Sequence, residues 1–144
     1  MNWSEKVAIV TGGASGIGEA TVREFAAEGA AVAIFDVNLA AGEQLATELS
    51  AAGHRAAFYH TDVSNLEACT GAVNAVVAKW GRLDYLVNSA VSFIGKGGDA
   101  TPSDWDRSRV VKGRGTAYMA QACHLAMKAS GGGAGAPAVI KRIL

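Results

Sequence analysis

The glycine-rich stretch at residues 11–18, Thr-Gly-Gly-Ala-Ser-Gly-Ile-Gly, has the residue types needed to bind an anion. An apolar, β-branched run at residues 6–10 precedes it and predicts a buried strand. A helical pattern follows it and ends at Gly29, where a helix stop is expected. Glycine is needed because a Cβ would block both the tight turn and the close approach of a pyrophosphate. Strand, glycine turn and helix together aim backbone N–H groups and a helix N-terminus at such an anion.

A second candidate for chemistry is Asp36, which ends a second apolar run at residues 31–35. A carboxylate at this place can accept hydrogen bonds from the ribose hydroxyls of adenosine, and it would repel a 2′-phosphate. Residue 37 is Val, and the glycine turn contains no Arg or Lys that could attract that phosphate. The sequence therefore favours NAD over NADP. The alternative for Asp36 is an exposed acid at a strand end.

Alternating strands and helices must position these residues. Strands are expected at residues 6–10, 31–35, 56–60, 83–87 and 138–140. Between them the pattern predicts helices, including one at residues 66–80 that begins after Ser64 or Asn65 and stops at Gly81, and a long one at residues 101–129. This alternation favours an α/β fold in which helices cover both faces of a parallel sheet.

Several motifs resemble the short-chain dehydrogenase/reductase family. The pattern Thr-Gly-x-x-x-Gly-x-Gly at residues 11–18 is similar to that of the family, and so are Asp62-Val63, the segment 86–91 and the segment 105–116. The resemblance covers about residues 5 to 133. It implies a Rossmann-like doubly wound parallel sheet, here incomplete with about four to five strands. Residues 1–144 would then be a single, partial NAD-binding domain.

The resemblance also implies a role for each residue of a cofactor site. Three glycines would shape the turn, two residues would line the pyrophosphate and nicotinamide side, and the others would hold the adenosine ribose, the adenine and the inner ribose. In that order these are Gly12, Gly16 and Gly18; Ser15 and Ile17; Asp36; Asp62 and Val63; Asn88 and Ala90.

The catalytic motif of the family is missing from this sequence. The family's proton donor is a Tyr followed four positions later by a Lys, which lowers the pKa of the phenol. Here Tyr59, Tyr85 and Tyr118 are followed at that spacing by Val63, Ser89 and Ala122. Lys112 stands where the family has a catalytic Asn, and a cation cannot replace an amide that both donates and accepts hydrogen bonds. Ser89 and Val91 replace the Asn and Gly of the family's fourth-strand motif.

The expected function is therefore that of a truncated homologue with no catalytic residue of its own. The family reaction is hydride transfer between NAD and an alcohol or carbonyl substrate, and this chain alone is predicted not to catalyse it. One alternative is a non-catalytic nucleotide-binding or scaffold protein that completes its sheet by self-association, as a homo-oligomer. Another is a degenerate gene product, in which a frame change near Gly133 produced the Gly/Ala-rich tail.

Composition excludes several other classes. Half of the 144 residues are apolar and the formal net charge is zero, as in a folded globular protein. No secretory signal or membrane-spanning run is seen, and Cys69 and Cys123 are expected to be buried free thiols, so a cytoplasmic location is predicted. The histidines show no metal-ligand spacing. All seven charged residues from Arg107 onward are basic, which favours a solvated helix face over a nucleic-acid surface.

Overall fold

Strands and helices alternate along residues 2–92, 97–131 and 138–141, which are the residues that the computed structural model describes. Two short 3₁₀ turns, η1 and η2, and one π-helical segment, η3, supplement the α-helices. In chain order the elements are η1 (Trp3–Glu5), β1 (Val7–Thr11), α1 (Gly16–Ala27), β2 (Ala31–Asp36), α2 (Leu39–Ala51), β3 (Ala56–His60), α3 (Leu66–Trp80), β4 (Tyr85–Asn88), η2 (Gly97–Asp99), α4 (Pro102–Arg109), η3 (Val110–Gly115), α5 (Thr116–Ser130) and β5 (Ala138–Lys141).

The strands form one parallel sheet in the order β3-β2-β1-β4-β5. The chain moves outward from β1 to β3 and then returns to place β4 on the other side of β1. Ile9 of β1 thus pairs with Ala33 on one side and with Leu86 on the other. A reversal of this kind opens a crevice at the carboxyl ends of the strands, where α/β proteins bind ligands. The predicted α/β fold with a doubly wound parallel sheet is confirmed.

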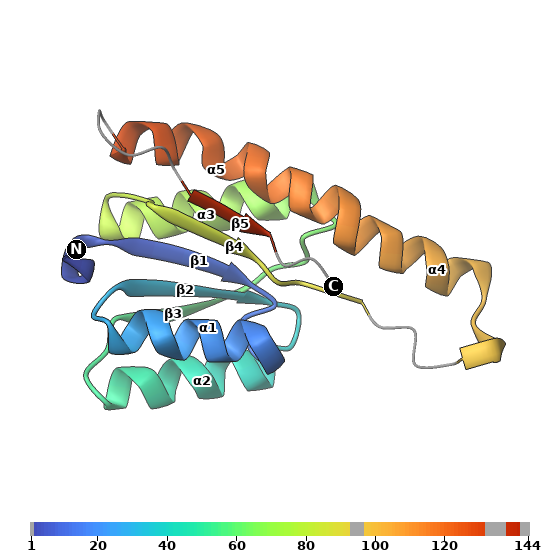
Figure 1. The fold of residues 1–144 in the computed structure, drawn as a ribbon, viewed down its shortest axis with the longest axis horizontal. Coiled ribbons are helices and arrows are strands. Elements are labelled where there is room, and N and C mark those ends of the chain that lie inside the picture. Colours follow the sequence, from blue (N-terminus) through green and yellow to red (C-terminus); the bar gives the residue numbers. More distant parts are fainter. Residues whose placement is uncertain (1, 93–96, 132–137, 142–144) are drawn as a thin grey trace.

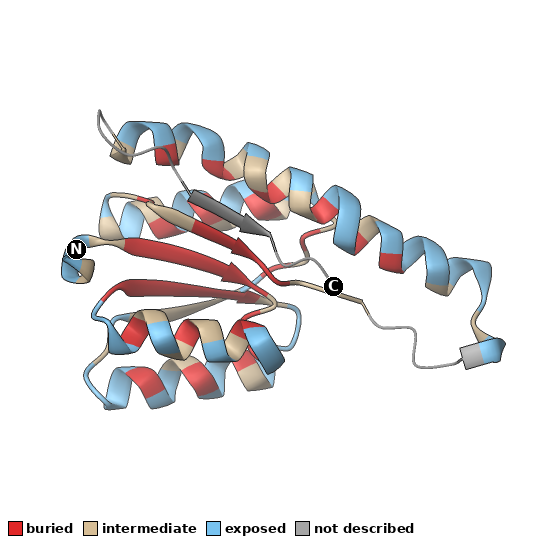
Figure 2. Cartoon of the chain, in the orientation of Figure 1, coloured by how far each residue is buried: buried red, intermediate tan, exposed pale blue. Residues whose placement is uncertain are grey.

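Helices cover both faces of the sheet, with α1 and α2 on one face and α3 and α5 on the other (Figure 1). Every residue of β1 is buried, as the red strands of Figure 2 illustrate, which explains why its sequence is continuously apolar and does not alternate. Alternate residues of β1 enter different cores. Val10 packs in the core under α1 and α2, whereas Ile9 packs with Cys69 and Cys123 under α3 and α5.

The fourth strand begins two residues later than the pattern predicts, at Tyr85 and not at Leu83. Leu83 is fully buried, and this accounts for its apolar signal. Its N–H, however, donates to the hydroxyl of Ser130 at 2.8 Å and not to a neighbouring strand. The N–H of Asp84 then donates to the carbonyl of Val7, and the ladder starts at the next residue.

The long helix predicted for residues 101–129 is found as α4, η3 and α5 in direct succession, ending at Ser130. It begins at a capping box, in which Thr101 and Asp104 bond to each other's backbone N–H groups. The sequence pattern did not predict the π-helical turns of η3. At their end, Gly115 approaches Val63 so closely that a Cβ at residue 115 would lie 2.7 Å from a Val63 methyl carbon. At this contact, the end of η3 packs directly on the loop after β3.

Candidate functional site

The glycine turn between β1 and α1 has the backbone geometry that only glycine adopts easily. Gly12 and Gly16 have φ values of 63° and 56°, in the left-handed region. Gly18 lies in the first turn of α1, and a Cβ there would sit 1.9 Å from the carbonyl oxygen of Gly12. Gly18 therefore brings the helix close to the turn and does not itself line the cavity described below.

The turn is joined to the end of β4 by the side chain of Thr11. Its hydroxyl accepts hydrogen bonds from the N–H groups of Ser89 and Ala90, both at 3.1 Å. Gly12 lies against the same segment, because a Cβ at this position would meet the Ala90 Cα at 2.8 Å. The glycine turn and the segment after β4 thus form one packed unit.

The N-terminus of α1 opens at this turn with its first backbone N–H groups available. Ser15 is the N-cap residue, is exposed, and makes no capping hydrogen bond with its side chain. Ile17, in the first turn, is 52% exposed. Four N–H groups at a helix N-terminus have no partner within the helix, and they attract anionic groups such as phosphates.

Asp36, at the end of β2, is fixed by two backbone N–H groups. One carboxylate oxygen accepts from Ala14 at 3.0 Å, and the other accepts from Asn38 at 2.9 Å. Each oxygen keeps a lone pair, so the carboxylate can still accept hydrogen bonds from a hydroxylated ligand. Val37, the next residue, is 54% exposed.

Asp62 follows β3 and is oriented by Ser64. One of its oxygens accepts from the Ser64 N–H at 3.0 Å and from the Ser64 hydroxyl at 2.6 Å. The other oxygen lies 3.9 Å from the guanidinium of Arg107, on α4. The hydrogen bond from the Ser64 side chain, above all, holds the pKa of Asp62 below its usual value, and the charge of Arg107 adds to this effect.

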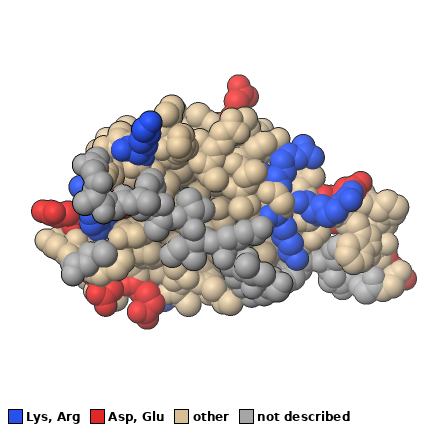
Figure 3. All heavy atoms as spheres, turned by 45° about the horizontal axis from the view of Figure 1, so that its top comes forward, with Lys and Arg blue, Asp and Glu red and all other residues tan. Residues whose placement is uncertain are grey.

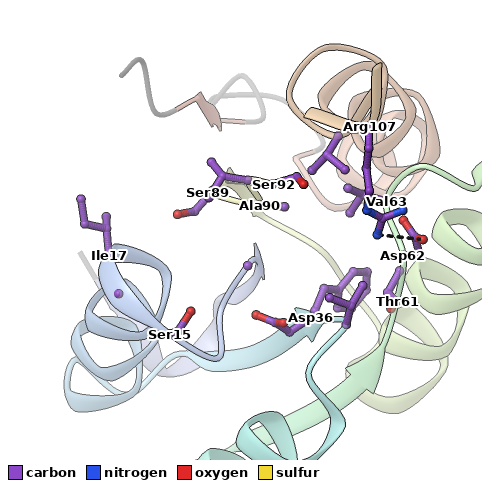
Figure 4. A pocket seen from close by; sticks show the side chains of 16 residues that line it. Ser15, Ile17, Asp36, Thr61, Asp62, Val63, Ser89, Ala90, Ser92 and Arg107 are labelled. Atoms are coloured by element: carbon purple, nitrogen blue, oxygen red, sulfur yellow. Dashed lines mark ion pairs between the residues drawn. The ribbon is translucent and has the colours of Figure 1, made fainter. Parts of the chain in front are cut away.

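These groups converge on a cavity of about 450 Å³ at the carboxyl ends of the strands. Figure 4 shows Ser15 and Ile17 at one end, Asp62 and Arg107 at the other, and Asp36 between them. Eight of the ten residues proposed from the sequence line it: Gly12, Ser15, Gly16, Ile17, Asp36, Asp62, Val63 and Ala90. Eight further lining residues were not predicted from the sequence: Phe35, Val37, Thr61, Ser89, Val91, Ser92, Arg107 and Val111.

The missed residues fall into two groups. Most adjoin a residue that was predicted, such as Val37 beside Asp36, and a wider window around each motif would have included them. Arg107 and Val111 come from α4 and η3, and no motif near the glycine turn points to them. Only the resemblance of residues 105–116 to a family segment gave a signal there.

Asn88 is buried at the end of β4 and does not line the cavity. Its side-chain nitrogen has no hydrogen-bond partner among the described residues. A buried amide without a partner is costly, and such groups in native structures commonly await a water or a ligand. The cavity wall itself fits a nucleotide through two features: the helix N–H groups at the start of α1 and the oriented carboxylate of Asp36.

No tyrosine lines this cavity among the residues described. Tyr59 packs on Phe35, and burial raises its pKa, which is opposite to what a proton donor near neutral pH requires. Tyr85 packs with Trp3 and Phe25 at the amino end of the sheet. Tyr118 packs against the core under α3 and α5.

Ser130 and Lys112 also lie outside the described cavity wall. The Ser130 hydroxyl donates to the carbonyl of Ala126 and accepts from the N–H of Leu83, so it joins α5 to the residues just before β4. Lys112 is exposed on η3 and is not among the residues that line the cavity, and its carbonyl accepts a hydrogen bond from the hydroxyl of Thr116 at 2.8 Å.

The cysteines are buried and free, as predicted. Burial, as the largest effect, raises the pKa of Cys69 to about 11 and that of Cys123 to about 12, so both stay protonated and unreactive at neutral pH.

Within the described ranges, no three His, Cys, Asp or Glu residues come together in a way that could hold a metal ion. In that same part of the chain, no helix is both long enough and apolar enough to cross a membrane.

Of the basic residues from Arg107 onward, Arg107 and Arg109 lie on α4 and Lys112 and Arg114 on η3, and Figure 3 shows blue and red side chains next to each other at one side of the molecule. Arg107 pairs with Asp62, and Arg109 pairs with Asp106 on the same helix. The run of basic residues in the sequence is therefore partly balanced in space by acidic residues that precede it.

Comparisons with known proteins agree with this geometry. The family model described as short chain dehydrogenase matches residues 6–135. D-threitol dehydrogenase of Mycolicibacterium smegmatis is 40% identical over 132 residues, which are 90% of this chain and 50% of that protein. Sorbitol dehydrogenase of Cereibacter sphaeroides is 37% identical over 134 residues, or 92% of this chain and 51% of that protein.

A solved structure gives the same result. A mutant short-chain dehydrogenase/reductase of Serratia marcescens superposes with a TM-score of 0.79 at 32% identity, and the match covers 88% of this chain and 53% of that one. The chain spans about half the length of the curated relatives it matches. The matched family model and the shared fold show that this chain belongs to the short-chain dehydrogenase/reductase family.

Proposed function

We propose that residues 1–144 form a single, partial nucleotide-binding domain that binds NAD in the cavity at the carboxyl ends of the strands. The observation that carries this proposal is the position of Asp36, midway along the cavity and beside the open N-terminus of α1 (Figure 4). A dinucleotide needs a site for its pyrophosphate and one for its ribose at about this relative position.

Each residue has a defined part in this proposal. The N–H groups at the start of α1, with Ser15, would bind the pyrophosphate, and Ile17 would border the nicotinamide side. Gly12 and Gly16 would shape the turn, while Gly18 would hold the helix against it. Asp36 would accept hydrogen bonds from the adenosine ribose. Asp62 and Val63 would border the adenine, and Asn88 and Ala90 the inner ribose.

NAD is favoured over NADP because of charge. A 2′-phosphate would lie against the Asp36 carboxylate, and like charges at contact distance repel strongly in a partly enclosed site. The residue beside it is Val37, which offers no compensating cation. Among the described residues, the cation that lines the cavity is Arg107, which lies at the far end beside Asp62 (Figure 4).

Calorimetric titration tests this proposal. The protein is expected to bind NAD with one site per chain and NADP at least about tenfold more weakly, which is about 1.4 kcal/mol. Asp36→Ala should abolish the preference for NAD as well as most of the affinity. Equal affinity for the two dinucleotides in the unaltered protein would contradict the assignment of Asp36.

We further propose that these 144 residues alone do not catalyse hydride transfer between NAD and an alcohol or carbonyl substrate, the reaction implied by the family. The support is the absence of a Tyr-x-x-x-Lys pair from the sequence and of a tyrosine from the described cavity wall. NAD-dependent oxidation of secondary alcohols or polyols by the purified chain, at rates above those of a Gly18→Ala control, would contradict this.

Self-association is a second candidate property, favoured by the position of β5. Among the described strands, β5 pairs with β4 on one side only and so stands at the edge of the sheet. An unpaired parallel edge is commonly covered by another element or chain. A homo-oligomer that covers this edge is expected in light scattering, and a monodisperse monomer would contradict it.

A cytoplasmic location is also proposed, because the two cysteines are free thiols, which are typical of a reducing compartment.

The frame change considered near Gly133 falls on residues 132–137, outside the described residues.

A further inference from the structure

Arg107 is the cation among the described residues that line the cavity, and it comes from an element far from the glycine turn. It lies on α4, whereas Asp62 lies in the loop after β3, and the two side chains meet across one end of the cavity (Figure 4). The opposite end holds Ser15 and Ile17 at the helix N-terminus. The Arg107 end is therefore the base end of any dinucleotide whose pyrophosphate lies on α1.

The ion pair between Arg107 and Asp62 contributes little to folding. Its atoms are 3.9 Å apart, and the side chains are 58% and 42% exposed. Exposed pairs of this kind contribute about 1 kcal/mol or less. Asp62 is already oriented through its other oxygen, by Ser64. The guanidinium is thus held near the carboxylate loosely enough to be shared with a ligand.

Apolar side chains make up most of the remaining wall. Val63 and Val111 line the cavity with Arg107, Phe35 and Val37 line it on either side of Asp36, and the hydroxyl of Thr61 is already bonded to the carbonyl of Tyr59. Apolar walls and a planar guanidinium suit a flat aromatic ring, because arginine stacks on aromatic faces while its edge still bonds to a carboxylate. Asp62, as an ionised carboxylate, accepts hydrogen bonds only. It therefore suits a ring with an amino group on its edge.

We propose that Arg107 is an affinity-determining residue of the site, which closes its base end by stacking on the purine that Asp62 borders, with the purine amino group facing Asp62. This inference rests on the proposed NAD site. Adenine presents an amino group at this edge, whereas hypoxanthine presents a carbonyl oxygen that the carboxylate would repel. Arg107 thus supplies affinity for the ring, and Asp62 supplies the choice between the two purines.

Calorimetric titration of four variants tests the proposal. The first ligands are NAD, ADP and nicotinamide mononucleotide, which lacks the purine. Arg107→Ala should weaken the binding of NAD and of ADP about tenfold, without changing the affinity for nicotinamide mononucleotide. Arg107→Lys keeps the positive charge but lacks the planar guanidinium that would stack on the ring, so it should not restore the affinity. Arg109→Ala, which removes a similar exposed arginine of α4 that pairs with Asp106, is the matched control and should bind as the unaltered protein does.

The fourth variant, Asp62→Asn, should reduce the preference for NAD over nicotinamide hypoxanthine dinucleotide, while Arg107→Ala should leave that ratio unchanged. Thermal unfolding without ligand should give the same midpoint for Arg107→Ala and Arg109→Ala. Unaltered ADP binding by Arg107→Ala, or full rescue by Arg107→Lys, would overturn the stacking role while the NAD site stands. Failure of the unaltered protein to bind either NAD or ADP would instead overturn the proposed function itself.

Discussion

The carboxylate of Asp36 accepts a hydrogen bond from the backbone N–H of Ala14 at 3.0 Å, across the space between the end of β2 and the glycine turn. The residue proposed to hold the ribose therefore also fixes the turn proposed to hold the pyrophosphate. Its second oxygen, bonded to Asn38, anchors the chain at the start of α2. The proposed binding role and a role in folding thus fall on the same side chain.

Replacing Asp36 should consequently lower stability even without cofactor. Asp36→Ala removes two hydrogen bonds to a charged group, and we expect the free energy of unfolding to fall by about 1–3 kcal/mol. Urea denaturation of the free protein measures this change. Glu43→Ala, which removes an exposed acid from α2, is the control and should change stability little. Equal stability of the two variants would show that Asp36 does not brace the turn.

Gly18 and Gly71 should respond in opposite ways to the same substitution. A Cβ at Gly18 would lie 1.9 Å from the Gly12 carbonyl oxygen, whereas one at Gly71, within α3, meets nothing within 4 Å. Gly18→Ala should therefore destabilise the fold by about 1–3 kcal/mol or more and remove NAD binding. Gly71→Ala should stabilise it by about 0.5–1 kcal/mol, because alanine loses less backbone entropy in a helix. Thermal unfolding of both variants tests the pair, and a tolerated Gly18→Ala would contradict the geometry of the turn.

Asp84 should make stability depend on pH. Burial of its side chain, which is 9% exposed, raises the pKa, but hydrogen bonds from Arg82 and from the Val7 N–H, with the charges of Arg82 and Lys6, outweigh burial and lower it. Because the folded pKa lies below the ordinary value of 3.8, the stabilisation is present at neutral pH. It is lost as the pH falls below that value and approaches the folded pKa.

Asp84→Asn should therefore cost about 2 kcal/mol at pH 7, and its difference from the unaltered protein should shrink as the pH is lowered below 3.8. Chemical denaturation over a pH series measures both effects. Asp106→Asn, at an exposed pair with Arg109, serves as the control. A difference that stays constant down to acid pH would mean that the charge of Asp84 is not the source of the stabilisation.

Ser130 should matter for folding and not for chemistry. Ser130→Ala leaves the buried N–H of Leu83 without its acceptor, and an unsatisfied buried group of this kind costs about 1–3 kcal/mol. Ser50→Ala removes a long, exposed hydrogen bond to Ala56 and should cost much less. Comparison of their unfolding midpoints tests the difference. A change in NAD affinity with no change in stability would contradict the structural role of Ser130.

Local signals account for what the sequence predicted well. The Asn65 side chain caps α3 through the N–H of Ala68, and Gly81 ends the helix in the left-handed conformation, so both boundaries are encoded within a few residues. The predicted start of β4 was wrong because Leu83 is buried like a strand residue but does not pair with a neighbouring strand. Its apolar side chain enters the core, while its N–H bonds to a helix that lies 47 positions later.

Contacts between distant segments explain the parts of the site that the sequence did not predict. The approach of Gly115 to Val63 and the pairing of Arg107 with Asp62 both join the long helix to the loop after β3. Neither follows from periodicity or from a motif, because each depends on how α4 and η3 lie relative to the loop after β3. Gly18 illustrates the converse: its place in the motif was evident, but its role in packing required the structure.

The most direct test of the central claim is an NMR titration of the isotope-labelled protein with NAD. The proposed site predicts that the backbone amide signals that shift most belong to residues 12–18 and to Asp36, Asp62, Val63 and Ala90, which line one cavity or directly adjoin a residue that does. The shifts should saturate at one NAD per chain and be much smaller with NADP. Shifts confined to another surface would contradict the proposed site, for example shifts at the groove between Trp3 of η1 and Phe25 of α1. The absence of shifts at saturating NAD would contradict it too.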